Sequence, residues 1–153
     1  ILPDNVTQQV FSTEQVYFLS DLSIKGGGFY GLSSKMPNEW MVYGSVRVPV
    51  VKGYAIEPYY FYSRVENAPR PENRFLLNNQ FRTAKGYELN IGVLYGKAGV
   101  ERDVQNDNIY GGYATALLPF SQNVWAQISV RWEKAPFDEL MAAALGIKLR
   151  LER

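Results

Sequence analysis

Residues 87–96 read Tyr-Glu-Leu-Asn-Ile-Gly-Val-Leu-Tyr-Gly, with a large apolar side chain at every second position from Tyr87 to Tyr95. The positions between them are mainly small or polar, as at Glu88 and Gly92. A β-strand directs successive side chains to opposite faces of its sheet. The alternation therefore predicts a strand with one apolar face and one polar face.

The same two-residue period recurs along most of the chain. Clear alternation is found at 40–48, 54–64, 87–96, 124–132 and 140–152, and weaker alternation at 16–25, 74–83 and 109–118. These segments predict eight strands within a single domain, residues 16–153, which follows a polar lead-in at residues 1–15. Only residues 134–145 compete with a helix, because Asp138 could cap an alanine-rich stretch. We prefer a strand there, because alternation continues and Gly146 would weaken a helix.

The connections between these segments alternate in length. The longer ones are Gly26–Asn38, Glu66–Asn73, Val100–Asn108 and Glu133–Glu139, and the shorter ones are Pro49–Gly53, Ala84–Gly86 and Pro119–Asn123. Such alternation is typical of an up-and-down antiparallel meander with loops at one end and tight turns at the other. Eight such strands are expected to close into a barrel, since closure removes exposed edges. Pro58 lacks a ladder donor, so we also expect a β-bulge there.

Composition excludes several classes of function. The chain has 153 residues, no Cys and no His, and a formal net charge of +1. Without these two residue types it has no disulfide, thiolate nucleophile, Ser-His triad or imidazole metal ligand. The near-zero charge also argues against an electrostatic nucleic-acid binder. We therefore expect no metal, no cofactor and no catalytic site; a carboxylate pair at Glu57 and Glu88 is the weakest alternative.

The orientation of the apolar face separates the two leading interpretations. A soluble lipocalin-like barrel would place that face inside, around a small apolar ligand, whereas a transmembrane β-barrel would turn it outward to lipid. The polar face is rich in small residues, which suit a crowded barrel interior: Ser45, Gly92, Gly96, Gly112, Ala114, Ala116, Ser129, Ala142, Ala144 and Gly146. We therefore favour the transmembrane interpretation and retain the soluble carrier as the alternative.

Charges of both signs lie on the polar face of the predicted barrel. The expected interior cluster consists of Arg47, Glu57, Glu88, Arg131, Lys148 and Arg150. Opposite charges inside a barrel can neutralise one another, which buried charge requires. The cluster is therefore interpreted as interior ion pairing.

Aromatic residues end the apolar face at two levels. Tyr54 and Tyr87 lie beside the short turns, and Trp40, Tyr62, Tyr95 and Trp132 lie beside the long loops. Two belts of outward-facing aromatic rings around an aliphatic band are expected at the two interfaces of a bilayer.

The last strand carries the most specific family pattern. Ala144, Gly146, Leu149 and Leu151 have the spacing of an assembly signal of the form polar-x-Gly-x-x-apolar-x-aromatic, although Ala replaces the polar residue and Leu the final aromatic one. Together with the alternation and the belts, this pattern resembles the small outer-membrane β-barrels of Gram-negative bacteria, of the OmpX/Ail and OmpA-barrel type.

The resemblance implies an integral outer-membrane protein with a structural or interaction role. Its loops would contact lipopolysaccharide or other envelope proteins. The chain begins at Ile1 without a basic or apolar leader, so we expect either a mature form from which a signal peptide has been removed or a trimmed form. Enzymes among the outer-membrane barrels rely on a catalytic His, which this chain lacks. Near the long loops, Arg64, Arg70, Arg74 and Arg102 could bind lipopolysaccharide phosphates or could be ordinary surface charge.

Overall fold

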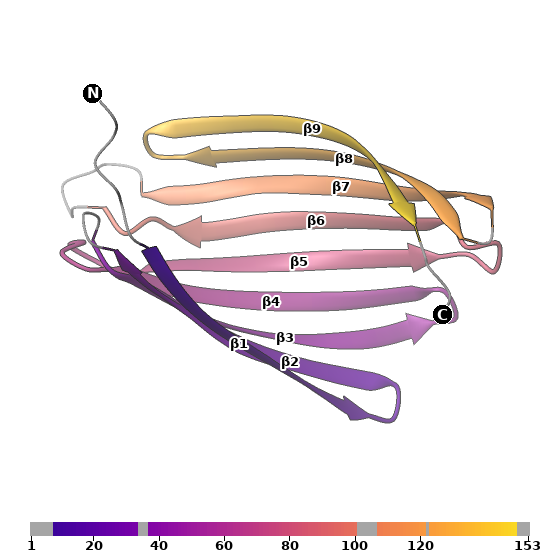
Figure 1. The fold of residues 1–153 in the computed structure, drawn as a ribbon, viewed down its shortest axis with the longest axis horizontal. Helices are drawn as coiled ribbons and strands as arrows, with labels where there is room; N and C mark the ends of the chain where they lie inside the picture. The colour runs from indigo at the N-terminus through magenta and orange to yellow at the C-terminus, as the bar shows by residue number, and fades with distance from the viewer. Residues whose placement is uncertain (1–7, 34–36, 101–106, 122, 150–153) are drawn as a thin grey trace.

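The computed structural model describes residues 8–33, 37–100, 107–121 and 123–149, which form one antiparallel sheet of nine strands (Figure 1). The strands are β1 (Gln8–Leu19), β2 (Leu22–Ser33), β3 (Glu39–Val51), β4 (Tyr54–Val65), β5 (Glu72–Arg82), β6 (Glu88–Lys97), β7 (Asn108–Ser121), β8 (Val124–Ala135) and β9 (Asp138–Leu149). Over these described residues, no helix is long and apolar enough to cross a membrane.

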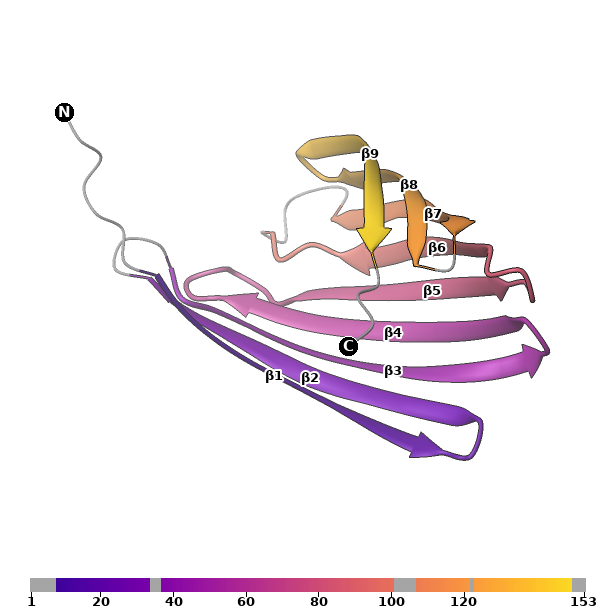
Figure 2. The same ribbon diagram turned by 45° about the vertical axis from the view of Figure 1, so that its right-hand side comes forward.

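The sheet is an up-and-down meander, as the sequence predicted, but it is not a closed eight-stranded barrel. Each strand pairs with the next one along the chain, in the order β1 to β9. Within the described residues no ladder joins β1 to β9, so these two strands form the edges of an open sheet. The sheet curls between them into a trough, which Figure 2 shows from the side. The all-β antiparallel class is confirmed, whereas the strand number and the closure were wrong.

The additional strand arises from a turn that the sequence pattern concealed. Residues 16–25 were expected to form one strand, but they contain the turn at Ser20 and Asp21, across which Leu19 pairs with Leu22. Ser20 adopts a positive φ of 55°, a conformation that usually requires Gly or Asn. Residues 8–15, expected in the lead-in, therefore belong to β1.

Loop lengths differ between the two ends of the sheet. Connections 34–38, 66–71 and 98–107 lie at one end, here called the long-loop end, and connections 20–21, 52–53, 83–87 and 122–123 lie at the other, the short-turn end. The connection between β8 and β9 is only 136–137, so the long loop expected at Glu133–Glu139 was wrong. Residues 138–149 form β9, which confirms the strand prediction over the helix.

The two faces of the sheet follow the two-residue period. Directly paired residues share a face, and the ladder places Lys25, Ser45, Tyr59 and Leu76 on the same side. This is the concave face, where the buried polar residues lie; apart from glycines, the buried residues in the described part of the chain are Ser45, Ala55, Glu57, Asn78, Ala98, Ile109 and Leu117. The convex face carries most of the exposed aliphatic and aromatic side chains, such as Val93, although Val10, Val16 and Phe18 on the edge strand β1 are exposed on the concave face.

Three small residues of β7 lie opposite to the expected side. Gly112, Ala114 and Ala116 pair with Val93, Ile91 and Leu89, so they belong to the convex face. The concave positions of β7 hold larger side chains, including Tyr113 and Leu117. The concave face is thus less uniformly small than the sequence suggested.

The β-bulge expected at Pro58 is absent, since Pro58 faces Leu77 on β5 and the register with β3 is the same on both sides of it, although the β3–β4 ladder skips Glu57 and Pro58. Register shifts occur instead beside two other prolines, between Pro49 and Val51 on β3 and between Pro119 and Ser121 on β7. Both lie near the short-turn end. These two prolines therefore lie at irregular positions of the ladder, whereas Pro58 interrupts the β3–β4 ladder without a change of register.

Candidate functional site: the polar networks of the trough

The first polar network lies on β3, β4 and β5, on the concave face. Glu57 is only 5% exposed and accepts hydrogen bonds from Ser45 Oγ (3.0 Å) and from Gln80 Nε2 (2.6 Å). Gln80 Oε1 in turn accepts a hydrogen bond from Arg47 Nε at 2.9 Å. The charge of Arg47 therefore acts on the buried Glu57 carboxylate through the Gln80 amide. The same hydrogen bonds connect β3 to β5 across β4.

Beside this network the concave face is filled by polar and aromatic side chains. Asn78, directly opposite Glu57 in the ladder, is equally buried. The Tyr113 ring lies over Gly92, where an added Cβ would approach the ring to 2.2 Å. Gly92 is thus the residue that allows Tyr113 to lie against β6.

The second network is an ion-pair cluster near the long-loop end. Arg74 on β5 lies 2.5 Å from Glu72 and 2.7 Å from Glu133 on β8. Glu133 also pairs with Arg131, at 2.5 Å. Two carboxylates and two guanidinium groups therefore form a compensated cluster that spans β5 to β8.

Glycine residues on β6 and β7 leave space beside the side chains of this ion-pair cluster. Gly96 on β6 pairs with Arg74 and Gly111 on β7 pairs with Glu133. A Cβ on Gly96 would lie 2.3 Å from a β5 carbonyl oxygen and 3.1 Å from Arg74 Cγ. With no side chain at either position, Arg74 can reach a carboxylate on β8.

The predicted interior cluster is divided among separate partners. Arg47 reaches Glu57 only through Gln80, Glu88 pairs with Arg82 at 3.2 Å, and Arg131 pairs with Glu133. Lys148 lies on the exposed edge strand β9, on the concave side opposite Trp125, and Arg150 lies outside the described residues. Alternation did not identify the partners of these charges, which are Gln80, Arg82 and Glu133, with Glu72 and Arg74 completing the ion-pair cluster. These partners lie in segments whose alternation predicts strands, so their faces could be read from the sequence. Arg74 and Glu133 are, however, 59 residues apart, and alternation does not indicate which strands bring them together.

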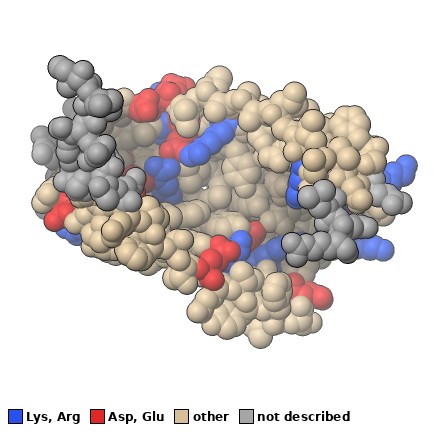
Figure 3. All heavy atoms as spheres, in the orientation of Figure 1, with Lys and Arg blue, Asp and Glu red and all other residues tan. Residues whose placement is uncertain are grey.

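Two cavities open onto the concave face. One, of about 550 Å³, lies at the short-turn end and is lined by polar groups including Arg47, Arg82 and Glu88. The other, of about 610 Å³, lies beside the ion-pair cluster, with an apolar floor that includes Leu76 and Leu94. Figure 3 looks into the trough, and Lys, Arg, Asp and Glu atoms lie along its sides. Among the described residues, no group of three or more acidic, His or Cys side chains could hold a metal ion.

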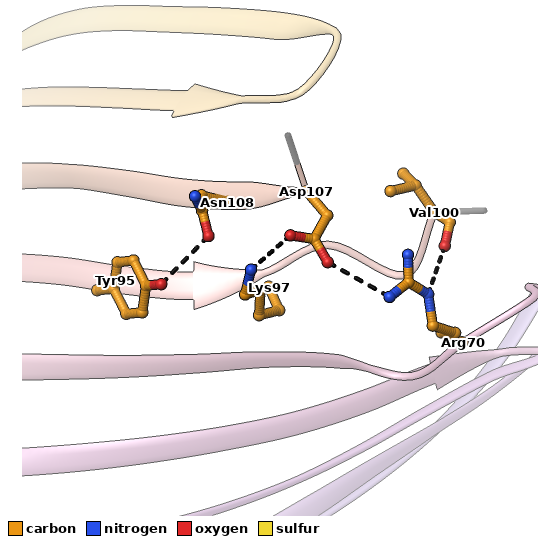
Figure 4. Close-up of polar contacts among 6 residues, drawn as sticks. All are labelled: Arg70, Tyr95, Lys97, Val100, Asp107 and Asn108. Atoms are coloured by element: carbon orange, nitrogen blue, oxygen red, sulfur yellow. Dashed lines mark hydrogen bonds and ion pairs between the residues drawn. The ribbon is translucent and has the colours of Figure 1, made fainter. Parts of the chain in front are cut away.

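A third polar cluster fastens two connections at the long-loop end (Figure 4). Asp107 accepts a 2.5 Å hydrogen bond from Lys97 Nζ and lies 3.4 Å from Arg70 Nη1. Arg70 Nε also donates to the Val100 carbonyl oxygen at 2.8 Å. The Lys97 hydrogen bond lowers the pKa of the Asp107 carboxyl, and the charges of Lys97 and Arg70 act in the same direction. The cluster joins connection 66–71 to connection 98–107.

Of the four arginines considered for lipopolysaccharide contact, two are engaged within the protein. Arg70 bonds Asp107 and Val100, and Arg74 belongs to the ion-pair cluster on the concave face. Arg64 is exposed near the end of β4, and Arg102 lies outside the described residues.

The aromatic residues of the predicted belts lie at the two ends of the sheet. At the long-loop end Trp40 packs against Tyr62, with ring centroids 5.3 Å apart, and Trp132 packs against Tyr110 at 5.7 Å. Tyr95 is exposed at the same end. At the short-turn end Tyr54 stacks on Phe81 at 4.7 Å, and Tyr87 is exposed in the connection before β6. Tyr110 and Phe81 were missed, although both occupy convex positions of their strands.

Polar side chains on the convex face are paired with tyrosine hydroxyls. The hydroxyl of Tyr54 lies 2.9 Å from Oδ1 of Asn79, on the neighbouring strand. Two further pairs join neighbouring strands at the long-loop end, Tyr60 with Asn73 at 3.3 Å and Tyr95 with Asn108 at 3.1 Å. These contacts satisfy amide groups on an otherwise apolar face.

The residues of the predicted assembly signal lie on the edge strand. Gly146 and Leu149 belong to β9, with Gly146 on the concave and Leu149 on the convex side. An added Cβ on Gly146 would meet no atom within 4 Å. Leu151 lies outside the described residues.

Comparisons were made with models of known families, with curated protein sequences and with solved structures. None of the three gives a significant match to this chain.

Proposed function

We propose that this chain forms the wall of a β-barrel in the outer membrane of a Gram-negative bacterium, with a structural or interaction role rather than a catalytic one. The convex face contacts lipid, and the concave face encloses the polar networks. The loops at the long-loop end contact lipopolysaccharide or other envelope proteins.

The observation that carries the proposal is the distribution of side chains between the two faces. The convex face exposes aliphatic residues such as Val93 and Ile128 in the middle of their strands, with aromatic rings nearer the strand ends. The concave face holds the buried Glu57 and the ion-pair cluster. Exposed apolar surface outside and compensated charge inside is the reverse of a water-soluble carrier.

Intrinsic tryptophan fluorescence provides a direct test. Trp40 and Trp132 lie on the convex face near the long-loop end, whereas Trp125 lies on the concave face, opposite Lys148. Three variants, each retaining one Trp and carrying Phe at the other two positions, are reconstituted in vesicles of brominated phosphatidylcholine. We expect strong quenching of Trp40 and Trp132 and weak quenching of Trp125.

Folding of each variant is checked by the difference in gel mobility between heated and unheated samples. Equal quenching of all three residues would contradict the face assignment. A protein that stays in water without detergent and binds a fluorescent fatty acid in its trough would support the soluble carrier instead.

A further inference from the structure

The two edges of the sheet leave far more apolar surface uncovered than its middle. Met141 and Leu145 on β9 are each 80% exposed, whereas Ile91 and Val93 on β6 are 40% and 56% exposed on the same convex face. At the other edge, Tyr17 on the convex face of β1 is 61% exposed, and Phe18 on its concave face is 78% exposed. A central strand has a neighbour on both sides and an edge strand on only one. The excess exposure therefore lies where a next strand would pack.

Neither edge carries the features that usually prevent strand addition. Natural edge strands are protected by charges, prolines, bulges or short length. Residues 140–147 of β9 contain no charged residue or proline, and Glu14 is the single charged residue of β1. Both strands have 12 residues, and the register shifts of the described ladders lie on β3 and β7. Both edges are therefore suited to pairing with a further strand.

The direction of the edge strands restricts which partner fits. In an antiparallel meander successive strands reverse direction, so β1 and β9 both run from the long-loop end to the short-turn end. Direct pairing of β1 with β9 would make one parallel ladder in an otherwise antiparallel sheet. In a second copy of the chain with the same membrane orientation, β1 and β9 would run in the same direction as here. Pairing between the edges of two copies would therefore also be parallel. Antiparallel pairing at both edges requires an odd number of additional strands.

We propose that an odd number of further antiparallel strands pairs with these two edges. The added strands lie between β9 and β1 and complete a barrel with an even number of strands. The strand beside β9 runs from the short-turn end to the long-loop end. It presents apolar side chains next to Leu145 and small or polar ones next to Ala144 and Gly146. This proposal rests on the proposed function, because it takes the trough as part of a membrane barrel.

The protein itself supplies a strand of the required direction and pattern. β8 (124–135) already pairs antiparallel with β9 along its other edge. In the test, extended variants of the full chain continue after Arg153 through an Asn-Gly turn. A copy of residues 124–135 placed there adds one strand. A copy of 124–149 gives two strands, and a copy of 124–149 followed by a second copy of 124–135 gives three.

Closure is detected by disulfide formation, which is unambiguous because the chain has no Cys. One Cys replaces Thr13 in the middle of β1, and the other is placed at successive convex positions of the last added strand. The unextended chain carries Thr13→Cys with Ala143→Cys or Leu145→Cys. All proteins are refolded in vesicles, and Trp40 quenching by brominated lipid is recorded on the same samples.

We expect an intramolecular disulfide with one or three added strands, and none with two or with the unextended chain. Closure with two strands, closure of the unextended chain, or failure of both odd extensions would each overturn the proposal. Disulfides between two copies would overturn it as well. Because Trp40 quenching reports lipid contact independently of closure, loss of quenching would instead indicate failure of the proposed function.

Discussion

A guanidinium nitrogen of Arg74 on β5 lies 2.7 Å from a carboxylate oxygen of Glu133 on β8, although two strands separate them. Gly96 on β6 and Gly111 on β7 lie between the two residues on the concave face, with Ile109 directly opposite Gly96 and Leu94 directly opposite Gly111. A Cβ on Gly111 would lie 2.3 Å from the Trp132 carbonyl oxygen. Gly111 therefore permits the close approach of β7 to the backbone of β8, the strand that carries Glu133.

Replacing Gly111 by Ala should destabilise the fold. The added methyl group collides with the backbone of β8, and overpacking of this kind costs about 1–3 kcal/mol. The free energy of unfolding in urea, measured in vesicles or micelles, provides the test. Gly146→Ala is the matched control, because its Cβ meets no atom within 4 Å and the change should be small. Equal effects of the two variants would show that the close approach at Gly111 does not matter.

Glu133→Gln should reduce stability by about 1–3 kcal/mol, because Arg74 and Arg131 lose a shared carboxylate in a partly buried site. Urea unfolding at neutral pH measures the change. Glu88→Gln is the control: its partner Arg82 is 73% exposed, so the loss should stay within about 1 kcal/mol. A Glu133 variant as stable as the Glu88 variant would mean that the ion-pair cluster contributes little.

Ile128→Arg should impair insertion into lipid. Ile128 lies in the middle of β8 on the convex face, and arginine near the bilayer midplane of a barrel costs about 2–4 kcal/mol. The heat-modifiable fraction after refolding into vesicles is the measurement. Gln127→Arg places the same charge one residue away on the concave face and should insert nearly normally. The opposite order of the two variants would reverse the assignment of the faces.

The contact between Tyr54 and Asn79 should be measurable by a double-mutant cycle. Tyr54→Phe removes the hydroxyl and leaves Oδ1 of Asn79 without that partner on the convex face, at a cost of about 1 kcal/mol. With Asn79→Leu also present, removal of the hydroxyl should cost much less. Unfolding free energies of the four proteins give the coupling. A coupling of zero would show that the pair does not stabilise the fold.

Asp107 should titrate below its ordinary pKa. Its ionised form is stabilised by Lys97, so its contribution to stability is present above the unfolded-state pKa of about 4 and is lost as pH falls through the lower folded-state value. The chemical shift of the Asp107 carboxyl carbon in micelles follows this titration. Lys97→Met should move the midpoint upward. An unchanged midpoint in that variant would indicate that Lys97 does not bond Asp107 in solution.

The strand pattern was predictable at the β3–β4 turn and misleading at the β1–β2 turn, which has neither Gly nor Pro. The turn between β3 and β4 has Gly53 at a φ of 84°, and the sequence located it. Ser20 adopts a similar conformation without a glycine, so the β1–β2 hairpin resembled one strand. Conversely, Gly27 suggested a loop but lies inside β2, where a Cβ would meet the Tyr43 ring at 2.6 Å. Packing against Tyr43 accounts for glycine at position 27, whereas no Gly or Pro in the sequence marks the turn at Ser20.

The concave residues were predictable individually, but their partners were not. Parity placed Arg47, Glu57 and Arg131 on one face, because alternation along each strand is a local property. Pairing depends instead on which strands curve toward each other and where glycine leaves space. For that reason the contact of Arg74 with Glu133 emerges only from the three-dimensional structure.

The ion pair between Arg74 and Glu133 connects the two outer strands of a curved group of four, β5 to β8. Its two ends are fixed to the outer strands of that group, so the lengths of the two side chains limit how far β5 to β8 can flatten. Glu133→Asp shortens this side chain by one methylene group. The sheet should then either curve more tightly between β5 and β8 or lose the contact with Arg74. The diameter of the completed wall would then be set by two side chains as well as by strand number and stagger.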